Sequence, residues 1–202
     1  MTEFCDDGLK IETLGYGPAF AATKTDAVGT RLAEDITDLE HWANWAVEIA
    51  ADAHGSVRSA GPADTRIEYE LTDDDMRKIR RGVAIMSELF LAAGADFIAP
   101  GVHGWTDRIE SPEDLEGFEE EGPLERAHYD FIVSHMFGTC RMGSDPEDNV
   151  VRPDFRHHEV DQLYVADSSV FPTNLGVNPQ ISIMTMAARC ADRILQGTGN
   201  EE

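Results

Sequence analysis

Apolar residues recur at helical spacing in three stretches of this chain. The clearest covers residues 73–94, where they stand three and four positions apart at Met76, Ile79, Val83, Met86 and Phe90. Thr72 with an acid three residues later, Asp75, has the form of a capping box, and Gly94 follows as a stop signal. The pattern predicts a long amphipathic helix.

The same spacing predicts two further helices. One covers residues 38–50, with a stripe formed by Leu39, Trp42, Ala46 and Ile49. The other runs from Pro179 to a stop at Gly197, with a stripe formed by Ile181, Met184, Ala188, Ala191 and Leu195. A shorter helix is predicted for residues 111–118, because proline follows a serine cap there.

Short runs of strand-forming residues, several of them alternating with polar ones, predict β-strands between the helices. They are residues 8–13, 55–58, 65–71, 96–103 and 163–166. The Gly61-Pro62 pair predicts a turn between the second and third of these strands. Strand-rich sections interleaved with helices predict an α+β fold with a mainly antiparallel sheet.

Composition changes the picture through charge. Sixteen Lys and Arg against thirty-nine Asp and Glu give a formal net charge of −23, which argues against nucleic acid or an anionic membrane surface as a partner. Such a chain repels itself at low ionic strength, whereas about 1 M salt shortens the Debye length to about 3 Å. We therefore expect adaptation to high salt; the alternative is an ordinary acidic protein.

The cysteines and the apolar runs bear on location. Cys5, Cys140 and Cys190 are widely spaced and odd in number, so they predict buried thiols and no disulfide framework or CxxC metal site. The first residues contain neither a basic region nor a long apolar run, and no stretch reaches the ~18 consecutive apolar residues of a membrane helix. We expect a cytoplasmic protein without a membrane span.

Two positions carry candidate chemistry. His135 follows the apolar run Phe131-Ile-Val and precedes a turn at Gly138. Histidine suits proton transfer near neutral pH, although a lone histidine is more often structural. Asn178 stands at the N-cap of the last predicted helix, with Pro179 at the first helical position. Because helix N-termini favour negative charge, this end is suited to a phosphate or an anionic ring.

These positions lie inside a longer pattern of four segments. In order, they are His135-Met-Phe-Gly-Thr-Cys-Arg-Met-Gly-Ser-Asp-Pro146, Val150-Val-Arg152, Val160-Asp-Gln-Leu-Tyr-Val-Ala-Asp-Ser-Ser-Val-Phe-Pro-Thr173 and Gly176-Val-Asn-Pro-Gln180. Together they resemble the C-terminal signature of the glucose-methanol-choline (GMC) family of flavin oxidoreductases. The resemblance is dense, and its segments come in the family's order.

The resemblance implies roles for individual residues. His135 corresponds to the histidine that accepts the hydroxyl proton while a hydride leaves the alcohol carbon for flavin N5. Asn178 takes the place of the second catalytic residue, which is histidine in some members and asparagine in others. The residues implied to face FAD are Asp167, Ser168, Asn178, Pro179 and Gln180. Without the resemblance, Asp167 would be interpreted as the cap of the turn that follows it.

The resemblance also implies that part of the cofactor site is missing. Family members bind FAD through a βαβ unit with GxGxxG, whereas Gly15-Tyr-Gly17 lacks the third glycine and is interpreted as a turn. We expect residues 1–130 to form an N-terminally incomplete substrate-binding domain. Residues 131–202 then form the catalytic segment, whose last strand and helix complete the FAD-binding domain. A separate chain with GxGxxG supplies the rest, or the chain is truncated.

The predicted activity is therefore FAD-dependent oxidation of an alcohol, and other classes remain open. An inactive truncated fragment or a non-enzymatic acidic interaction module would need neither His135 nor the capped loop. A metal-dependent hydrolase would use histidines with the abundant carboxylates, but no HxxxH or HExxH spacing occurs. His157 and His158 are adjacent, diverge on any regular element, and are interpreted as surface or loop residues.

Overall fold

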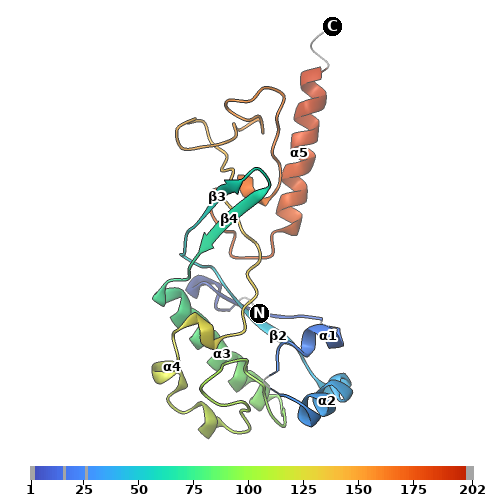
Figure 1. Ribbon diagram of the computed structural model, residues 1–202, viewed down its shortest axis with the longest axis vertical. Helices are drawn as coiled ribbons and strands as arrows, with labels where there is room; N and C mark the ends of the chain where they lie inside the picture. The colour runs from blue at the N-terminus through green and yellow to red at the C-terminus, as the bar shows by residue number, and fades with distance from the viewer. Residues whose placement is uncertain (1–2, 16, 26, 199–202) are drawn as a thin grey trace. The chain divides into compact units, whose positions relative to one another are not determined.

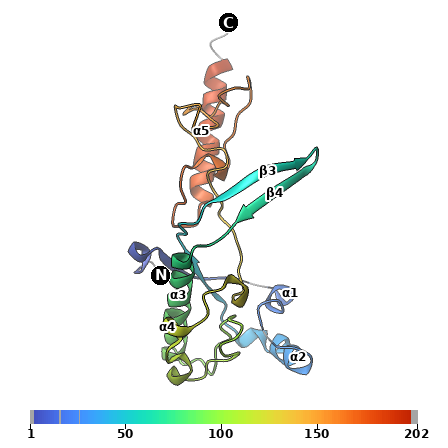
Figure 2. The ribbon, with the colours of Figure 1, turned by 60° about the vertical axis from the view of Figure 1, so that its left-hand side comes forward.

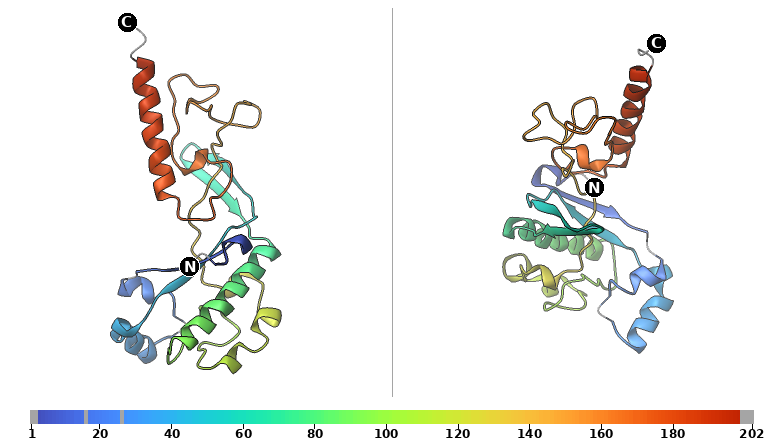
Figure 3. Two further views of the ribbon diagram at one scale, coloured as in Figure 1. Left: turned by 180° about the vertical axis from the view of Figure 1, so that it is seen from behind. Right: turned by 45° about the horizontal axis from the view of Figure 1, so that its top comes forward.

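The computed structural model describes residues 3–15, 17–25 and 27–198. The chain divides into two compact units (Figures 1 and 3). Unit 1 consists of Met1–His54 and Glu70–Ile132, and unit 2 of Gly55–Tyr69 and Val133–Glu202. The predicted boundary between residues 130 and 131 stays a prediction. The segment Gly55–Tyr69 is grouped with the C-terminal part of the chain.

Helices and antiparallel strands make up both units, so the fold is α+β, as predicted. The elements of unit 1 are η1 (Cys5–Asp7), β1 (Leu9–Thr13), α1 (Pro18–Ala21), α2 (Thr30–Thr37), η2 (Leu39–His41), β2 (Trp45–Ile49), α3 (Asp73–Ala92), η3 (Pro112–Leu115), α4 (Phe118–Glu121) and η4 (Arg126–His128). Those of unit 2 are β3 (Gly55–Gly61), β4 (Asp64–Tyr69), η5 (Ser168–Val170) and α5 (Gln180–Thr198). The η elements are short 3-10 helices.

Unit 1 is built from one helix on a two-stranded sheet. β1 pairs antiparallel with β2, Leu9 lying opposite Ile49 and Ile11 opposite Val47. Leu9 and Ile11 are almost fully buried, as alternation along a half-buried strand requires. α3 packs close to the sheet at Gly82, where a side chain would meet Val47 and Leu9. The predicted strand at residues 8–13 is confirmed.

The start of α3 confirms the predicted capping box. The Thr72 hydroxyl accepts a hydrogen bond from the Asp75 amide at 3.1 Å, and the Asp75 carboxylate accepts from the Thr72 amide at 3.0 Å. Asp75 is fully buried and also accepts from the amides of Asp52 and Ala53 at 2.8 and 3.2 Å. One carboxylate therefore caps the helix and holds the segment that follows β2.

The predicted helix at residues 38–50 is wrong. The structure has the short η2 there, followed by the strand β2. Trp45 to Ile49 pair residue by residue with β1, so backbone hydrogen bonds to a distant segment outweigh the local helical spacing. Trp42 packs edge to face on Phe97 and Trp45 on Phe90, with ring centroids 5.4 Å apart in both pairs.

The predicted strands at residues 96–103 and 163–166 do not form. Single bridges at Ile98, Val102 and Tyr164 replace them. A strand needs a neighbour along its length, and these segments meet one at single positions only.

The prediction of buried thiols fails for two cysteines, because Cys5 is exposed and Cys140 half-buried, whereas Cys190 is buried.

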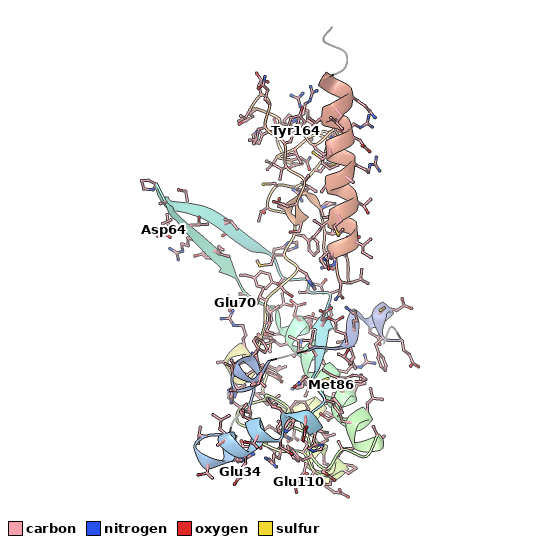
Figure 4. All side chains as sticks on the ribbon, turned by 90° about the vertical axis from the view of Figure 1, so that its right-hand side faces the viewer. Glu34, Asp64, Glu70, Met86, Glu110 and Tyr164 are labelled. Carbon is pink, nitrogen blue, oxygen red and sulfur yellow. The ribbon has the colours of Figure 1, made fainter. Side chains whose placement is uncertain are left out.

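Unit 2 consists of a hairpin, an irregular segment and a long helix (Figure 2). β3 and β4 pair antiparallel with Val57 opposite Ile67, which confirms both predicted strands. Val57 and Ile67 are 47% and 62% exposed, and Figure 4 places Asp64 at the projecting tip. The irregular segment that carries Tyr164 lies beside α5 in the same view. No helix in the described ranges is long and apolar enough to cross a membrane.

Candidate active site

His135 is one of three non-glycine residues of unit 2 with a positive φ, together with Phe155 and Gln162. Its φ is 56°, in the left-handed region that residues other than glycine rarely adopt. The residue lies in an irregular segment near Val133, where the chain enters unit 2 again, and Gly138 turns the chain with a φ of 84°. Val133 and Met136, on either side of His135, are 53% and 44% exposed. The candidate base therefore stands on a sharply bent, solvent-facing and largely apolar loop.

Asp167 begins the turn that faces this loop. Its Oδ1 accepts hydrogen bonds from the amide of Ser169, at 2.8 Å, and from the Ser169 hydroxyl. Asp167 is thus the side-chain cap of η5, which is the role expected of it without the family resemblance. Val170, the last residue of η5, is 1% exposed and anchors the turn in unit 2.

The His135 loop and the η5 turn are joined directly. The amide of Cys140 donates to the carbonyl of Ser169 at 3.1 Å, and the amide of Met142 donates to the carbonyl of Val170 at 2.9 Å. The Phe137 and Phe171 rings meet edge to face, with centroids 5.8 Å apart. Two predicted site residues, His135 and Asp167, are thereby held in one arrangement although they are distant in sequence.

Of the remaining predicted site residues, Asn178, Pro179 and Gln180 lie at the start of α5. This helix begins at Gln180, and the carbonyl of Pro179 accepts from the amide of Ile183 at 2.8 Å. The position before the helix is therefore Pro179, one residue later than the predicted cap at Asn178. Asn178 and Gln180 are exposed, whereas Pro179 is buried. Ser168 is half-buried at the start of η5, which lies beside the first half of α5 (Figures 1 and 3).

Sequence reasoning missed the residues that hold this arrangement together. Phe137, Ser169 and Phe171 belong to the family-like segments, yet nothing in their spacing shows that they meet. A signal was present for Ser169, because Asp followed by Ser two residues later is typical of a side-chain-capped turn. The contact between aromatic rings depends on chain reversal between distant segments, which local pattern does not encode.

The two adjacent histidines of unit 2 have structural partners. His157 Nδ1 accepts hydrogen bonds from the amides of Glu159 and Val160, at 3.0 and 3.1 Å, and His158 Nε2 contacts the Gly143 carbonyl at 3.0 Å. Both are loop residues, as predicted. Burial raises the pKa of the Cys190 thiol. Across residues 3–15, 17–25 and 27–198, no group of three or more His, Cys, Asp or Glu side chains is arranged to hold a metal ion.

A concave region of unit 1 lies elsewhere on the chain and is acidic. It has a volume of about 380 Å³ and is lined by Glu88, Pro112, Glu113, Leu115 and Glu116. None of the predicted site residues lines it.

A family model described as GMC oxidoreductase matches residues 47–187, which include every predicted site residue. The chain belongs to the GMC oxidoreductase family. It corresponds to the C-terminal part of that family, as the signature predicted.

Curated relatives agree with this membership. The chain is 37% identical over 131 residues to long-chain-alcohol oxidase FAO4A of Arabidopsis thaliana, a match that covers 61% of this chain and 18% of that protein. It is 35% identical over 105 residues to choline oxidase of Arthrobacter globiformis, covering 52% of this chain and 17% of that protein. The matched part of the chain is thus less than a fifth of the length of either relative.

A solved structure is also similar. The crystal structure of pyridoxine 4-oxidase from Mesorbium loti matches 75% of this GMC chain and 29% of that chain, with a TM-score of 0.49 and 24% sequence identity.

The donor set of unit 2 fits one part of a flavin. α5 is long enough to have a full N-terminal turn, whose amides have no partner within the helix and favour negative charge. Asn178 and His135 are further exposed polar residues of the same unit. No GxGxxG loop before a long helix, the arrangement that holds a dinucleotide pyrophosphate, is found within residues 3–15, 17–25 and 27–198. Gly15 and Gly17 precede only the four-residue helix α1.

Proposed function

We propose that this chain provides the catalytic half of an FAD-dependent oxidoreductase that acts on the CH–OH group of an alcohol. The main support is that backbone hydrogen bonds join the His135 loop to the turn that Asp167 caps. Both lie within the residues that match the GMC family. An exposed histidine with a left-handed backbone is energetically unfavourable unless its surroundings hold it, and such outliers gather at functional sites.

Each residue has a chemical task in this proposal. His135 accepts the hydroxyl proton of the alcohol at an imidazole nitrogen, and the Asn178 amide donates a hydrogen bond to the substrate oxygen. Gln180 and the first turn of α5 direct amides and the helix dipole at negative charge, with Pro179 fixing the approach. Asp167 and Ser168 lie along the side of the cofactor. FAD, when bound, supplies the acceptor for the hydride from the alcohol carbon.

One face of α5 is apolar and exposed, and it is the proposed partner surface. The stripe of α5 at Ile181, Met184, Ala188, Ala191 and Leu195 is exposed throughout, with Ile181 at 79% and Met184 at 62%. The opposite stripe, which includes Met186 and Cys190, packs within unit 2. An apolar helix stripe in water is unfavourable by about 25 cal/mol per Å². We propose that a unit bearing GxGxxG covers it, either in a separate chain or in a longer form of this protein.

His135→Ala tests the proposal. In an assembly that contains FAD and this chain, we expect kcat for alcohol oxidation to fall by roughly 10² to 10⁴, the usual contribution of one positioned acid–base group. The matched control is His41→Ala, which removes an exposed histidine of unit 1. Near-normal turnover in His135→Ala would assign the proton transfer elsewhere, and a wild-type assembly inactive on all alcohols would favour the interaction-module alternative.

Asn178 provides a second arm of the same experiment. Asn178→Ala should lower kcat because the substrate oxygen loses a hydrogen-bond donor, whereas Asn178→His should be milder because an imidazole N–H can donate there. A kcat of Asn178→Ala equal to that of the wild type would remove Asn178 from the site.

A further inference from the structure

The η5 turn has a property that the proposed chemistry does not use. Its two final carbonyls, those of Ser169 and Val170, accept hydrogen bonds from the amides of Cys140 and Met142. These amides close the turn that follows His135. The position of the His135 loop therefore depends on the conformation of a three-residue 3-10 helix.

That short helix depends in turn on Asp167. A 3-10 helix of three residues has little internal hydrogen bonding, so its first amides need a side-chain acceptor. Asp167 Oδ1 accepts from both the amide and the hydroxyl of Ser169, the residue whose carbonyl holds Cys140. One carboxylate oxygen thus stabilises the turn at its start, and one carbonyl transmits the constraint to the loop.

The loop needs such a constraint. A φ of 56° at His135 is disfavoured for a residue with a Cβ, and it persists only where neighbouring contacts fix the backbone on both sides. On the C-terminal side of His135, Gly138 turns the chain with a φ of 84°. The contacts that fix this side are the Phe137 ring against Phe171 and the hydrogen bond from the Cys140 amide to the Ser169 carbonyl.

We propose that Asp167 and Ser169 are positioning residues for His135 that act through the η5 turn, in addition to the proposed place of Asp167 beside the cofactor. The effect on catalysis rests on the proposed function. The contact itself, in which Asp167 Oδ1 holds the His135 loop through Ser169, exists in the chain without cofactor.

Amide hydrogen exchange in the 202-residue chain without FAD tests the positioning role. Asp167→Ala should speed exchange at the Cys140 and Met142 amides by roughly tenfold, the effect of losing one capping side chain. Asp167→Asn should restore slow exchange, because the amide oxygen accepts the same two hydrogen bonds. Ser169→Ala, which removes only the hydroxyl bond, should give a smaller effect and covers the case in which Asp167→Ala fails to fold.

The matched control is Asp161→Ala, which removes an exposed acid that has no hydrogen bond or ion pair in the described part of the chain. It should leave exchange at Cys140 and Met142 unchanged. Unchanged amide exchange in Asp167→Ala would overturn the proposal. Fast exchange in Asp167→Asn would also overturn it, because the negative charge of Asp167 would then matter and not its hydrogen bonds.

Turnover separates this inference from the proposed function. In the FAD-containing assembly, Asp167→Ala should lower kcat about tenfold with little change in KM, and Asp167→Asn should recover most of it. If exchange responds as expected but the wild-type assembly oxidises no alcohol, the proposed function fails and the positioning contact stands. If the wild type is active but exchange does not respond, the positioning role fails alone.

Discussion

Asp75 shows how much a single side chain contributes to unit 1. Burial acts to raise the pKa of this carboxyl, but hydrogen bonds from Asp52 and Thr72, and the charge of Lys78, outweigh it and hold the pKa below its ordinary value. A lowered folded-state pKa means that the carboxylate stabilises the fold above the unfolded-state pKa of about 3.9, and that this contribution is lost as the pH falls through the folded-state pKa.

We therefore expect Asp75→Asn to lower the free energy of unfolding by about 1 to 3 kcal/mol at pH 7, because amide donors in unit 1 lose a charged acceptor. The difference from wild type should narrow in acid, below about pH 4. Urea denaturation at pH 7 and pH 3 measures both effects. Asp73→Asn, an exposed neighbour in the same helical turn, is the control. A difference that stayed constant between the two pH values would contradict the charge argument.

At the same scale, the sequence predicted which residues carry the candidate chemistry but not how they are held. The capping box at Thr72 and Asp75 is a local pattern, and the structure confirms it. α5 begins at Gln180, one residue later than predicted, which is a difference commonly found at helix ends. The left-handed backbone of His135 has no sequence signal, because no local pattern around this residue requires it.

Among the elements, the contact of α3 with the β1–β2 sheet depends on one missing side chain. A Cβ at position 82 would clash with Val47 Cγ1 and approach Leu9 Cδ2 to 3.3 Å. In an unhindered helix, replacing glycine by alanine stabilises the protein by about 1 kcal/mol. Here we expect Gly82→Ala to destabilise it by about 1 to 3 kcal/mol, because the helix must move away from the sheet.

Denaturant unfolding of Gly82→Ala measures this cost, and Val47→Ala is the companion variant. The double variant Gly82→Ala with Val47→Ala should lose less free energy of unfolding than the two single variants together, because Val47→Ala removes the atom that clashes. Strict additivity would show that the helix and the sheet do not meet closely at this point.

The elements also show where sequence patterns fail. α3 was predictable because its spacing, cap and stop signal agree over many turns, and the β3–β4 hairpin because its turn separates two strand-forming runs. β2 was not, because the spacing of Leu39, Trp42, Ala46 and Ile49 imitates a helix while the pairing that decides it lies in β1. The absent strand at residues 163–166 is the reverse case, a strand-forming run that pairs only at Tyr164.

For the whole molecule, the formal charge of −23 predicts dependence on salt. We expect the melting temperature to rise by several degrees between low salt and 1 M KCl, because 1 kcal/mol of stability corresponds to about 2 to 4 °C at this size. Neutralising exposed acids of unit 1 by Glu113→Gln, Glu116→Gln, Glu119→Gln and Glu120→Gln should reduce the rise. Equal melting temperatures at both salt concentrations would reject adaptation to high salt.

The same charge and the exposed α5 stripe together determine how the 202 residues behave alone. Molar salt screens the repulsion between copies, so the apolar side chains at Ile181 and Met184 remain as a surface that water disfavours. We therefore expect the purified chain to self-associate in molar salt. It should also be colourless, because the phosphate-binding loop that contributes most of the affinity for a dinucleotide belongs to the proposed partner unit.

Size-exclusion chromatography and visible absorbance test both statements. Met184→Lys on the stripe should reduce self-association, and it should also weaken capture of a co-expressed unit bearing GxGxxG, whereas Arg193→Glu, off the stripe, should do neither. Yellow absorbance that is bleached by an alcohol should appear only after co-expression. A monomeric, bright yellow preparation of these residues alone would contradict the partner proposal, since the cofactor would then be held without the unit that the stripe is proposed to receive.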